Sequence, residues 1–207
     1  MPADVVLASN NRGKLEELCA LLPPWVRVQT AAELSVELPE ESGQTFAENA
    51  LLKARAAAGQ TGLVAVADDS GLEVDALRGL PGVRSARFAG EPSSDAANNA
   101  LLLERLAGVP APERGARFRS IVAVVTPEGD EWLAEGSVGG YIVLAPRGAN
   151  GFGYDPLFVP EGRDRTMAEL TLEEKNRISH RARAFEQAAR RLVPFLERRR
   201  TDSDRTS

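Results

Sequence analysis

Two adjacent carboxylates, Asp68 and Asp69, follow an apolar run of small and β-branched residues. Such a run predicts a buried strand, and open α/β sheets bind ligands at the carboxyl ends of their strands. Because successive strand residues point to opposite faces, the two acids can share one task only if the chain turns there, and Ser70-Gly71 favours a turn. Adjacent carboxylates repel each other unless a cation is near, which favours Mg²⁺. The alternative is a turn with two solvated acids.

A polar, glycine-containing segment separates a predicted strand at residues 4–8 from a predicted helix at residues 14–22. In this layout the backbone N–H groups and the helix N-terminus face an anion, and a lysine adds positive charge. The spacing differs from that of the Walker motif, and an ordinary capped loop would have a similar sequence. The candidate phosphate-binding residues are Ser9, Asn10, Asn11, Arg12, Gly13 and Lys14.

An acidic loop at residues 33–44 precedes a second predicted helix, which begins at a Thr45–Glu48 capping box and ends near Gln60. The loop is either a solvated connection or a source of one metal ligand, for which Glu41 is the first candidate and Glu40 the alternative. Lys53 lies on this helix four residues after Asn49, so the two share a face. Lys53 is a further candidate for binding phosphate.

A third group of candidates is in the C-terminal half of the chain. The segment from Gly148 to Pro156 combines glycines, two aromatic residues and an acid, which suits stacking against a flat base. An ordinary loop with its aromatic residues in the core is the alternative. A second capping box, at Thr171, starts a short helix that carries Lys175, and His180 and Arg181 begin the final predicted helix. His180 is either a helix-cap residue or a contact to substrate.

The composition limits the function classes. The chain has 207 residues and a formal net charge of −5, which argues against a nucleic-acid partner or a membrane surface because both require a basic face. No apolar run reaches the length of a membrane span, and no signal peptide is expected. The only cysteine, Cys19, excludes an internal disulfide, and a reduced cytoplasmic enzyme fits that count.

The remaining pattern predicts further strands at residues 26–30, 117–126, 131–144 and 157–160, with a short one at residues 72–77. A turn at residues 127–130 joins the two long strands, and residues 94–106 form a helix. Pro194 either kinks the final helix or marks its end. We expect residues 1–200 to form one domain and residues 201–207 to be a disordered tail.

Taken together, these segments resemble the inosine triphosphate pyrophosphatase family, also described as non-standard purine NTP pyrophosphatases or XTP/dITP diphosphatases. The resemblance covers residues 9–183 and keeps the order of the family's motifs. The chain has Ser9 where Thr is common, and Phe88 where Tyr is common, which removes one hydroxyl. The matching motifs are S-x-N-x-x-K from Ser9, E-E-S-G-x-T-F-x-E-N-A from Glu40, K-A at Lys53, D-D-S-G-L from Asp68, P-G-x-x-S-A-R from Pro81, G-F-G-Y-D-P from Gly151 and E-K-x-x-x-S-H-R from Glu174.

The resemblance implies an α/β fold in which helices flank a long, mixed, twisted central sheet, with two lobes and the nucleotide in the cleft between them. It also implies a homodimer. The implied reaction is hydrolysis of ITP, dITP and XTP to the monophosphate and pyrophosphate, in which Mg²⁺ neutralises the phosphates and a base activates the attacking water.

The resemblance also implies residue roles. Asp69 is the expected general base, and Glu41, Asp68 and Asp69 are the expected metal ligands. The expected phosphate contacts are the loop from Ser9 to Lys14, together with Lys53 and Ser70. The expected base contacts are Phe152, Gly153, Tyr154, Asp155, Lys175, His180 and Arg181.

Three alternatives stay open on the sequence. The first is a pyrophosphatase that removes other modified nucleotides, because the motifs define the phosphate chemistry better than the base. The second is a catalytically silent nucleotide sensor, against which the complete set of acids and lysines argues. A nuclease is a third alternative, and the acidic balance opposes it.

Overall fold

The computed structural model describes residues 3–206, with side chains described as far as Thr201. Six strands of this part of the chain form one sheet in the order β2-β1-β3-β4-β5-β6. β1 pairs in parallel with β2 and β3, whereas β5 and β6 are antiparallel, so the predicted mixed sheet and α/β class are confirmed. The strands are β1 (Ala3–Leu7), β2 (Val26–Thr30), β3 (Val64–Val74), β4 (Gly115–Val125), β5 (Glu131–Ile142) and β6 (Phe158–Pro160).

Five α-helices accompany these strands within the described residues: α1 (Arg12–Leu21), α2 (Phe46–Thr61), α3 (Asp95–Arg105), α4 (Leu172–Asn176) and α5 (His180–Thr206). The chain divides into two compact units. The described residues of unit 1 lie within Met1–Asp69, Ile121–Gly136 and Arg183–Ser207, and unit 2 comprises Ser70–Ser120 and Ser137–Ala182. β3, β4 and β5 contribute residues to both units.

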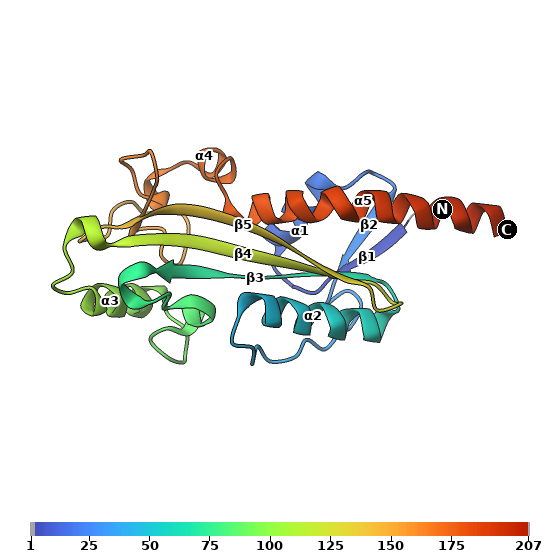
Figure 1. Ribbon diagram of the computed structural model, residues 1–207, viewed down its shortest axis with the longest axis horizontal. Coiled ribbons are helices and arrows are strands. Elements are labelled where there is room, and N and C mark those ends of the chain that lie inside the picture. The colour runs from blue at the N-terminus through green and yellow to red at the C-terminus, as the bar shows by residue number, and fades with distance from the viewer. Residues whose placement is uncertain (1–2, 207) are drawn as a thin grey trace. The chain divides into compact units, whose positions relative to one another are not determined.

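The core of unit 1 follows from the alternation of side chains along β1 and β3. Val5, Leu7, Val64 and Val66 pack with residues of α1 and α5, including the fully buried Leu18, Phe185 and Leu192. Side chains at the intervening positions point to the opposite face. On that face α2 presents the small buried residues Ala50, Ala54 and Ala57. Figure 1 shows α5 on one side of the strands and α2 on the other.

Unit 2 has its own core. Leu72 and Val74 of β3 pack with Leu102 and Leu106 at the C-terminal end of α3, and Phe118 of β4 lies edge-on to Phe158 of β6 with ring centroids 4.8 Å apart.

The turn predicted at Ser70-Gly71 is wrong. β3 runs without interruption from Val64 to Val74, so Asp68 and Asp69 lie in the middle of a strand, and the separate strand predicted at residues 72–77 is its continuation followed by a 3₁₀ turn, Asp75–Leu77. The neighbouring strand overrides the turn preference of these residues, and the Ser70 hydroxyl bonds the Ser120 hydroxyl of β4 at 2.9 Å.

The C-terminal helix also differs from expectation. α5 continues through Pro194 to Thr206, into the segment for which the sequence predicts disorder, while Ser207 lies outside the described residues. Packing beyond the proline holds the helix in place. Leu196 is buried in the core of unit 1, and the Phe195 ring lies 5.6 Å from that of Trp132.

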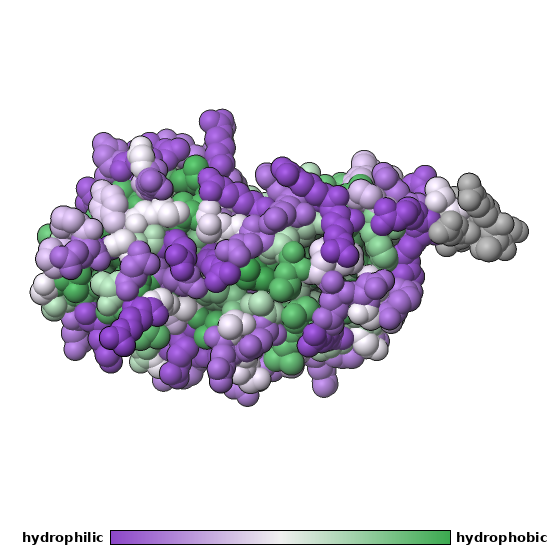
Figure 2. Space-filling model, viewed as in Figure 1, coloured by the Kyte–Doolittle hydropathy of each residue, from purple (hydrophilic) through white to green (hydrophobic). Residues whose placement is uncertain are grey.

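Hydrophilic residues cover most of the face in Figure 2, with hydrophobic residues in smaller groups between them. None of the described helices combines the length and apolar character that a membrane crossing requires. Cys19 is a free cysteine exposed on α1. Partial desolvation of the thiol by neighbouring atoms, together with the charge of Glu33, raises the pKa of Cys19, so the thiol is not an activated nucleophile.

The small residues of α2 yield a stability prediction. Ala54→Leu places extra methylene groups in a fully buried position against the sheet and should destabilise the fold by about 1–3 kcal/mol. Gly59→Ala in the same helix meets nothing within 4 Å and should stabilise it by roughly 0.5–1 kcal/mol. Urea unfolding of both variants and the wild type measures these effects. A free energy of unfolding for Ala54→Leu equal to that of Gly59→Ala would contradict the packing described for α2.

Candidate active site

The site in unit 1 forms where β1 ends beside a longer neighbour. β1 pairs with β3 only as far as Leu7 opposite Val66, and the Val66 carbonyl accepts the last bond on this edge, from Ala8 N–H at 2.8 Å. The next carbonyl on the same edge belongs to Asp68, two residues further along β3. It accepts a hydrogen bond from Lys53 Nζ at 2.7 Å instead of from a strand. The sheet edge is therefore open to side chains at the level of the two acids.

Asp68 faces the same side of the sheet as Val64 and Val66, which is the side covered by α1. Its carboxylate is fully buried and lies 2.7 Å from Lys14 Nζ. Lys14 stands in the first turn of α1, where Asn11 caps the helix by accepting the Lys14 backbone N–H at 3.2 Å. The predicted loop thus delivers its lysine directly to the predicted acid.

Asp69 faces the opposite side, toward α2. Its Oδ2 accepts a hydrogen bond from Asn49 Nδ2 at 2.9 Å, and Asn49 is fully buried. Asn49 Oδ1 in turn accepts the Gly43 N–H at 2.7 Å, which ties the acidic loop to the same group. A Cβ at Gly43 would lie 2.6 Å from Asn49 Oδ1, so this close approach requires glycine. We expect Asn49 to orient the Asp69 carboxylate.

Asn49 was not among the predicted site residues. The signal for it was its spacing of four residues from Lys53, since both side chains lie on one face of α2 and reach the same stretch of β3. Contacts with this helix face also distinguish the two candidate metal ligands of the acidic loop at residues 33–44. Lys53 Nζ pairs with Glu41 Oε1, whereas Glu40 is exposed. The geometry thus favours Glu41 over Glu40.

The donor chemistry fits a Mg²⁺ ion. Glu41, Asp68 and Asp69 offer hard carboxylate oxygens, and Mg²⁺ commonly takes only one or two carboxylates together with waters and substrate phosphates. In the part of the chain that the structure describes, no three acidic, histidine or cysteine groups gather as a complete metal enclosure. Lys14 and Lys53 instead neutralise Asp68 and Glu41.

The rest of the predicted phosphate loop divides into two kinds of residue. Asn10 and Ser9 have structural bonds: Asn10 Oδ1 accepts the Ala32 N–H at 2.9 Å, and Ser9 Oγ accepts the Asn11 N–H at 3.2 Å. Arg12 and Gly13 are exposed at the start of α1. Ser70 belongs to unit 2, and its hydroxyl is bonded to Ser120 of β4.

In unit 2 the segment from Gly148 to Pro156, called the aromatic loop below, exposes one aromatic side chain. Phe152 is 63 % exposed, and Lys175 Nζ lies 4.7 Å from its ring centroid. Lys175 also pairs with the buried Asp155, whose Oδ2 accepts the Phe152 N–H at 2.9 Å. The two-sided capping box at Thr171 starts α4 and so fixes the helix that carries Lys175. An exposed aromatic face is thereby held beside a lysine donor.

The other members of this loop support it from within. Tyr154 is buried, and its hydroxyl donates to the Ser85 carbonyl at 2.8 Å, so its side chain anchors the loop in the core of unit 2. Burial, with the nearby charge of Asp95, raises the pKa of Tyr154. Gly151 has φ +77°, and a Cβ there would overlap the Asp155 carboxylate. Both the backbone conformation and the lack of space therefore require glycine at this position.

His180 and Arg181 lie at the start of α5, as predicted. The His180 ring stacks on Phe118, with centroids 5.1 Å apart and planes 13° from parallel. This contact fixes the orientation of the imidazole against a core residue of unit 2. Arg181 follows it in the same helical turn.

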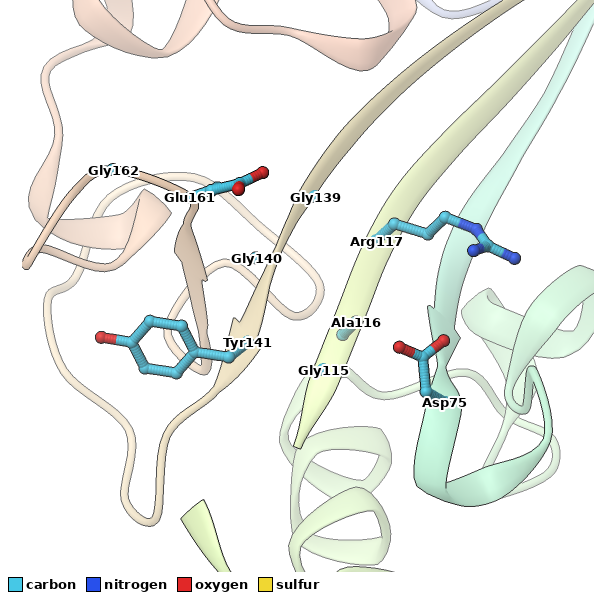
Figure 3. A pocket seen from close by; sticks show the side chains of 9 residues that line it. All are labelled: Asp75, Gly115, Ala116, Arg117, Gly139, Gly140, Tyr141, Glu161 and Gly162. Atoms are coloured by element: carbon cyan, nitrogen blue, oxygen red, sulfur yellow. The ribbon is translucent and has the colours of Figure 1, made fainter. Parts of the chain in front are cut away.

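A separate hollow of about 480 Å³ lies in unit 2, and none of the predicted site residues lines it. Figure 3 shows Asp75 and Arg117 on one side of it and Glu161 on the other, with glycines of β4 and β5 between them. Arg117 is held by Glu73 at 2.6 Å. The lining residues are Asp75, Gly115, Ala116, Arg117, Gly139, Gly140, Tyr141, Glu161 and Gly162.

Comparison with known proteins identifies relatives along almost the whole chain. The sequence model of the Ham1 family matches residues 5–191. A dITP/XTP pyrophosphatase of Pseudomonas aeruginosa is 56 % identical over 191 residues, which cover 91 % of this chain and 96 % of that protein. One of Elusimicrobium minutum is 50 % identical over 194 residues, covering 91 % of this chain and 98 % of the relative.

Solved structures agree with this result. A HAM1 protein from Coxiella burnetii superposes with a TM-score of 0.88 at 44 % identity, covering 93 % of this chain and 99 % of the other. A nucleoside-triphosphatase, dITP/XTP pyrophosphatase, from Mycobacterium abscessus gives a TM-score of 0.76 at 50 % identity, with 87 % and 96 % of the two chains covered.

The cap of α4 yields a titration prediction. A hydrogen bond from the Thr171 backbone N–H, followed by the Arg165 guanidinium at 2.6 Å, lowers the pKa of Glu174 from 4.5 to about 2. The pKa is lowered in the folded state, so the stabilisation from this cap is present above pH 4.5 and is lost as the pH falls toward 2. Carboxyl NMR titration of Glu174 checks the value. Arg165→Gln should raise the midpoint, and a wild-type midpoint near 4.5 would refute the assigned contacts.

Proposed function

The chain belongs to the Ham1 family, and on that premise we propose that it hydrolyses the non-standard purine nucleotides dITP, XTP and ITP to the monophosphate and pyrophosphate. The observation that carries this proposal is the group around β3, in which Asp69 is oriented by Asn49 while two lysines hold Asp68 and Glu41. This group combines a base with positive charge for a polyanion. The reaction would remove non-standard purine triphosphates from the nucleotide pool.

Asp69 acts as the general base in this proposal. Its carboxylate accepts a proton from the water that attacks the α-phosphorus, and the bond between that phosphorus and the pyrophosphate oxygen breaks. The amide of Asn49 holds Oδ2 and so sets the direction of the carboxylate.

Mg²⁺ is the proposed cofactor, with Asp68 and Glu41 as its ligands and Asp69 as a further contact. When bound, the ion neutralises charge on the phosphate oxygens. Lys14 and Lys53 lie beside these acids, and their ammonium groups would donate to the phosphates of the substrate. The backbone N–H groups at the start of α1 add to that binding.

Base recognition is assigned to the residues of the aromatic loop and its neighbours. The exposed Phe152 ring provides a stacking face, and Lys175 places a donor beside it. Hypoxanthine and xanthine carry an oxygen at C6, whereas adenine carries an amine. Donors from Lys175, His180 or Arg181 would therefore be left unpaired against adenine, and such unpaired groups discriminate strongly.

The proposal extends to assembly and location. The resemblance to the family supports a homodimer, and the single cysteine supports a reducing compartment such as the cytoplasm. Sedimentation equilibrium should give twice the chain mass of 22.2 kDa, and a concentration-independent monomer would rule out the homodimer.

The central prediction concerns Asp69→Asn, which keeps the shape of the side chain and removes its basicity. Turnover of dITP, XTP and ITP should fall by about 10²- to 10⁴-fold. Pyrophosphate release from these three nucleotides and from ATP, GTP and dTTP, with Mg²⁺ or with EDTA, measures it. Asp130→Asn, at an exposed turn of unit 1, is the matched control and should keep full activity.

Each contrary result has a distinct meaning. Release of orthophosphate would show that a different bond breaks. Equal activity on all six nucleotides would leave the phosphate group standing and refute the account of the base. Full activity in EDTA would refute the role of Mg²⁺, and tight ITP binding without turnover would favour a nucleotide sensor.

A further inference from the structure

Two side chains of α3 hold one residue of the aromatic loop by both of its backbone groups. Asp95 Oδ2 accepts a hydrogen bond from the Gly153 N–H at 2.6 Å, and Asn99 Nδ2 donates to the Gly153 carbonyl at 2.9 Å. Asp95 and Asn99 are four residues apart, so they project from the same face of the helix. Gly153 has φ +59°, a conformation that glycine adopts without strain.

Asp95 and Asn99, which together clamp Gly153, act directly beside the exposed Phe152. Asp155 fixes the Phe152 N–H on one side, and α3 fixes Gly153 on the other. The Phe152 backbone is therefore held while its ring stays 63 % exposed. A ring that is fixed before a ligand arrives binds with a smaller loss of conformational freedom.

We propose that Asp95 and Asn99 are positioning residues that hold Phe152 in place for the purine base and thereby set base selectivity. The inference rests on the proposed function, because it deepens the role given there to Phe152. Neither residue contacts the phosphates or the reacting atoms in this account. They act through the backbone of Gly153 alone.

The environment of Asn99 separates this role from simple stabilisation. Its Oδ1 is buried and has no hydrogen-bond partner among the side chains and backbone that the structure describes. A buried carbonyl without a partner destabilises a fold. An apolar side chain of the same size would avoid the cost of the unpaired oxygen, so stability alone does not explain an asparagine at this position. The hydrogen bond from Asn99 to the Gly153 carbonyl explains it.

The test compares four variants with the wild-type enzyme. Asn99→Leu removes the donor together with the unpaired oxygen, and Asp95→Ala removes the acceptor. Asp95→Asn keeps an acceptor oxygen and is the conservative rescue. Glu104→Gln removes an exposed acid from the far end of the same helix and serves as the matched control.

We expect Asn99→Leu and Asp95→Ala each to raise KM for ITP by about 2- to 10-fold, the worth of one hydrogen bond, with kcat nearly unchanged. The preference for ITP over ATP should fall by a similar factor. Inhibition by inorganic tripolyphosphate, which offers phosphate contacts and no base, should stay the same. The melting temperature of Asn99→Leu should equal or exceed that of the wild type, and Asp95→Asn and Glu104→Gln should match the wild type in every readout.

Other results would overturn the proposal. Wild-type KM and base preference in both clamp variants would show that the loop needs no clamp. Weaker inhibition by tripolyphosphate together with a lower melting temperature in Asn99→Leu would show a merely structural role. A wild-type enzyme that releases no pyrophosphate from any nucleotide would refute the proposed function itself, and with it this inference, so the two failures are distinguishable.

Discussion

The site in unit 1 depends on one mismatch in strand length. β1 stops after Leu7, while β3, its parallel neighbour, continues to Val74. The backbone of β3 therefore loses its partner on this edge just where its acids begin, and an unpaired buried carbonyl must find another donor. Lys53 supplies that donor at Asp68, and this bond brings α2 with Glu41 to the same place. An open sheet edge is thus converted into a charged site without any break in the strand.

The alternation of β3 gives the two neighbouring acids different surroundings. Asp68 is buried against a lysine on the side of α1, and Asp69 is buried against an amide on the side of α2. The Asp68–Lys14 pair combines a carboxylate that can bind a cation with an ammonium group that can bind phosphate, whereas a carboxylate that accepts a neutral amide is held in direction and is suited to act as a base. Adjacent positions can therefore serve the two different roles proposed for them, because a strand directs their side chains to opposite faces.

The sequence predicts the chemistry of this protein better than its local geometry. Residue types and helical spacing are sufficient to place Lys14, Lys53 and the two acids on strands and helices, and the capping residues Asn11, Thr45 and Thr171 mark where helices begin. The sequence predicts a turn at Ser70-Gly71, but pairing with β4 outweighs the local preference, and such pairing partners are remote in sequence. For the same reason, the sequence could not show that Tyr154 is buried under Ser85 or that Asp95 and Asn99 reach Gly153.

Binding of a non-hydrolysable ITP analogue with Mg²⁺ tests most directly whether the two adjacent carboxylates, which have separate partners, also have the separate roles proposed for them. Calorimetric titration of Asp68→Asn should show affinity weakened by about 10-fold or more, because a ligand of the ion and the partner of Lys14 are both lost. Asp69→Asn should lose less affinity and bind within about threefold of the wild type, because Asp69 is only a further contact of the ion and its main contribution is to the reaction. Equal loss of affinity in the two variants, or a larger loss in Asp69→Asn, would contradict the division of roles along β3.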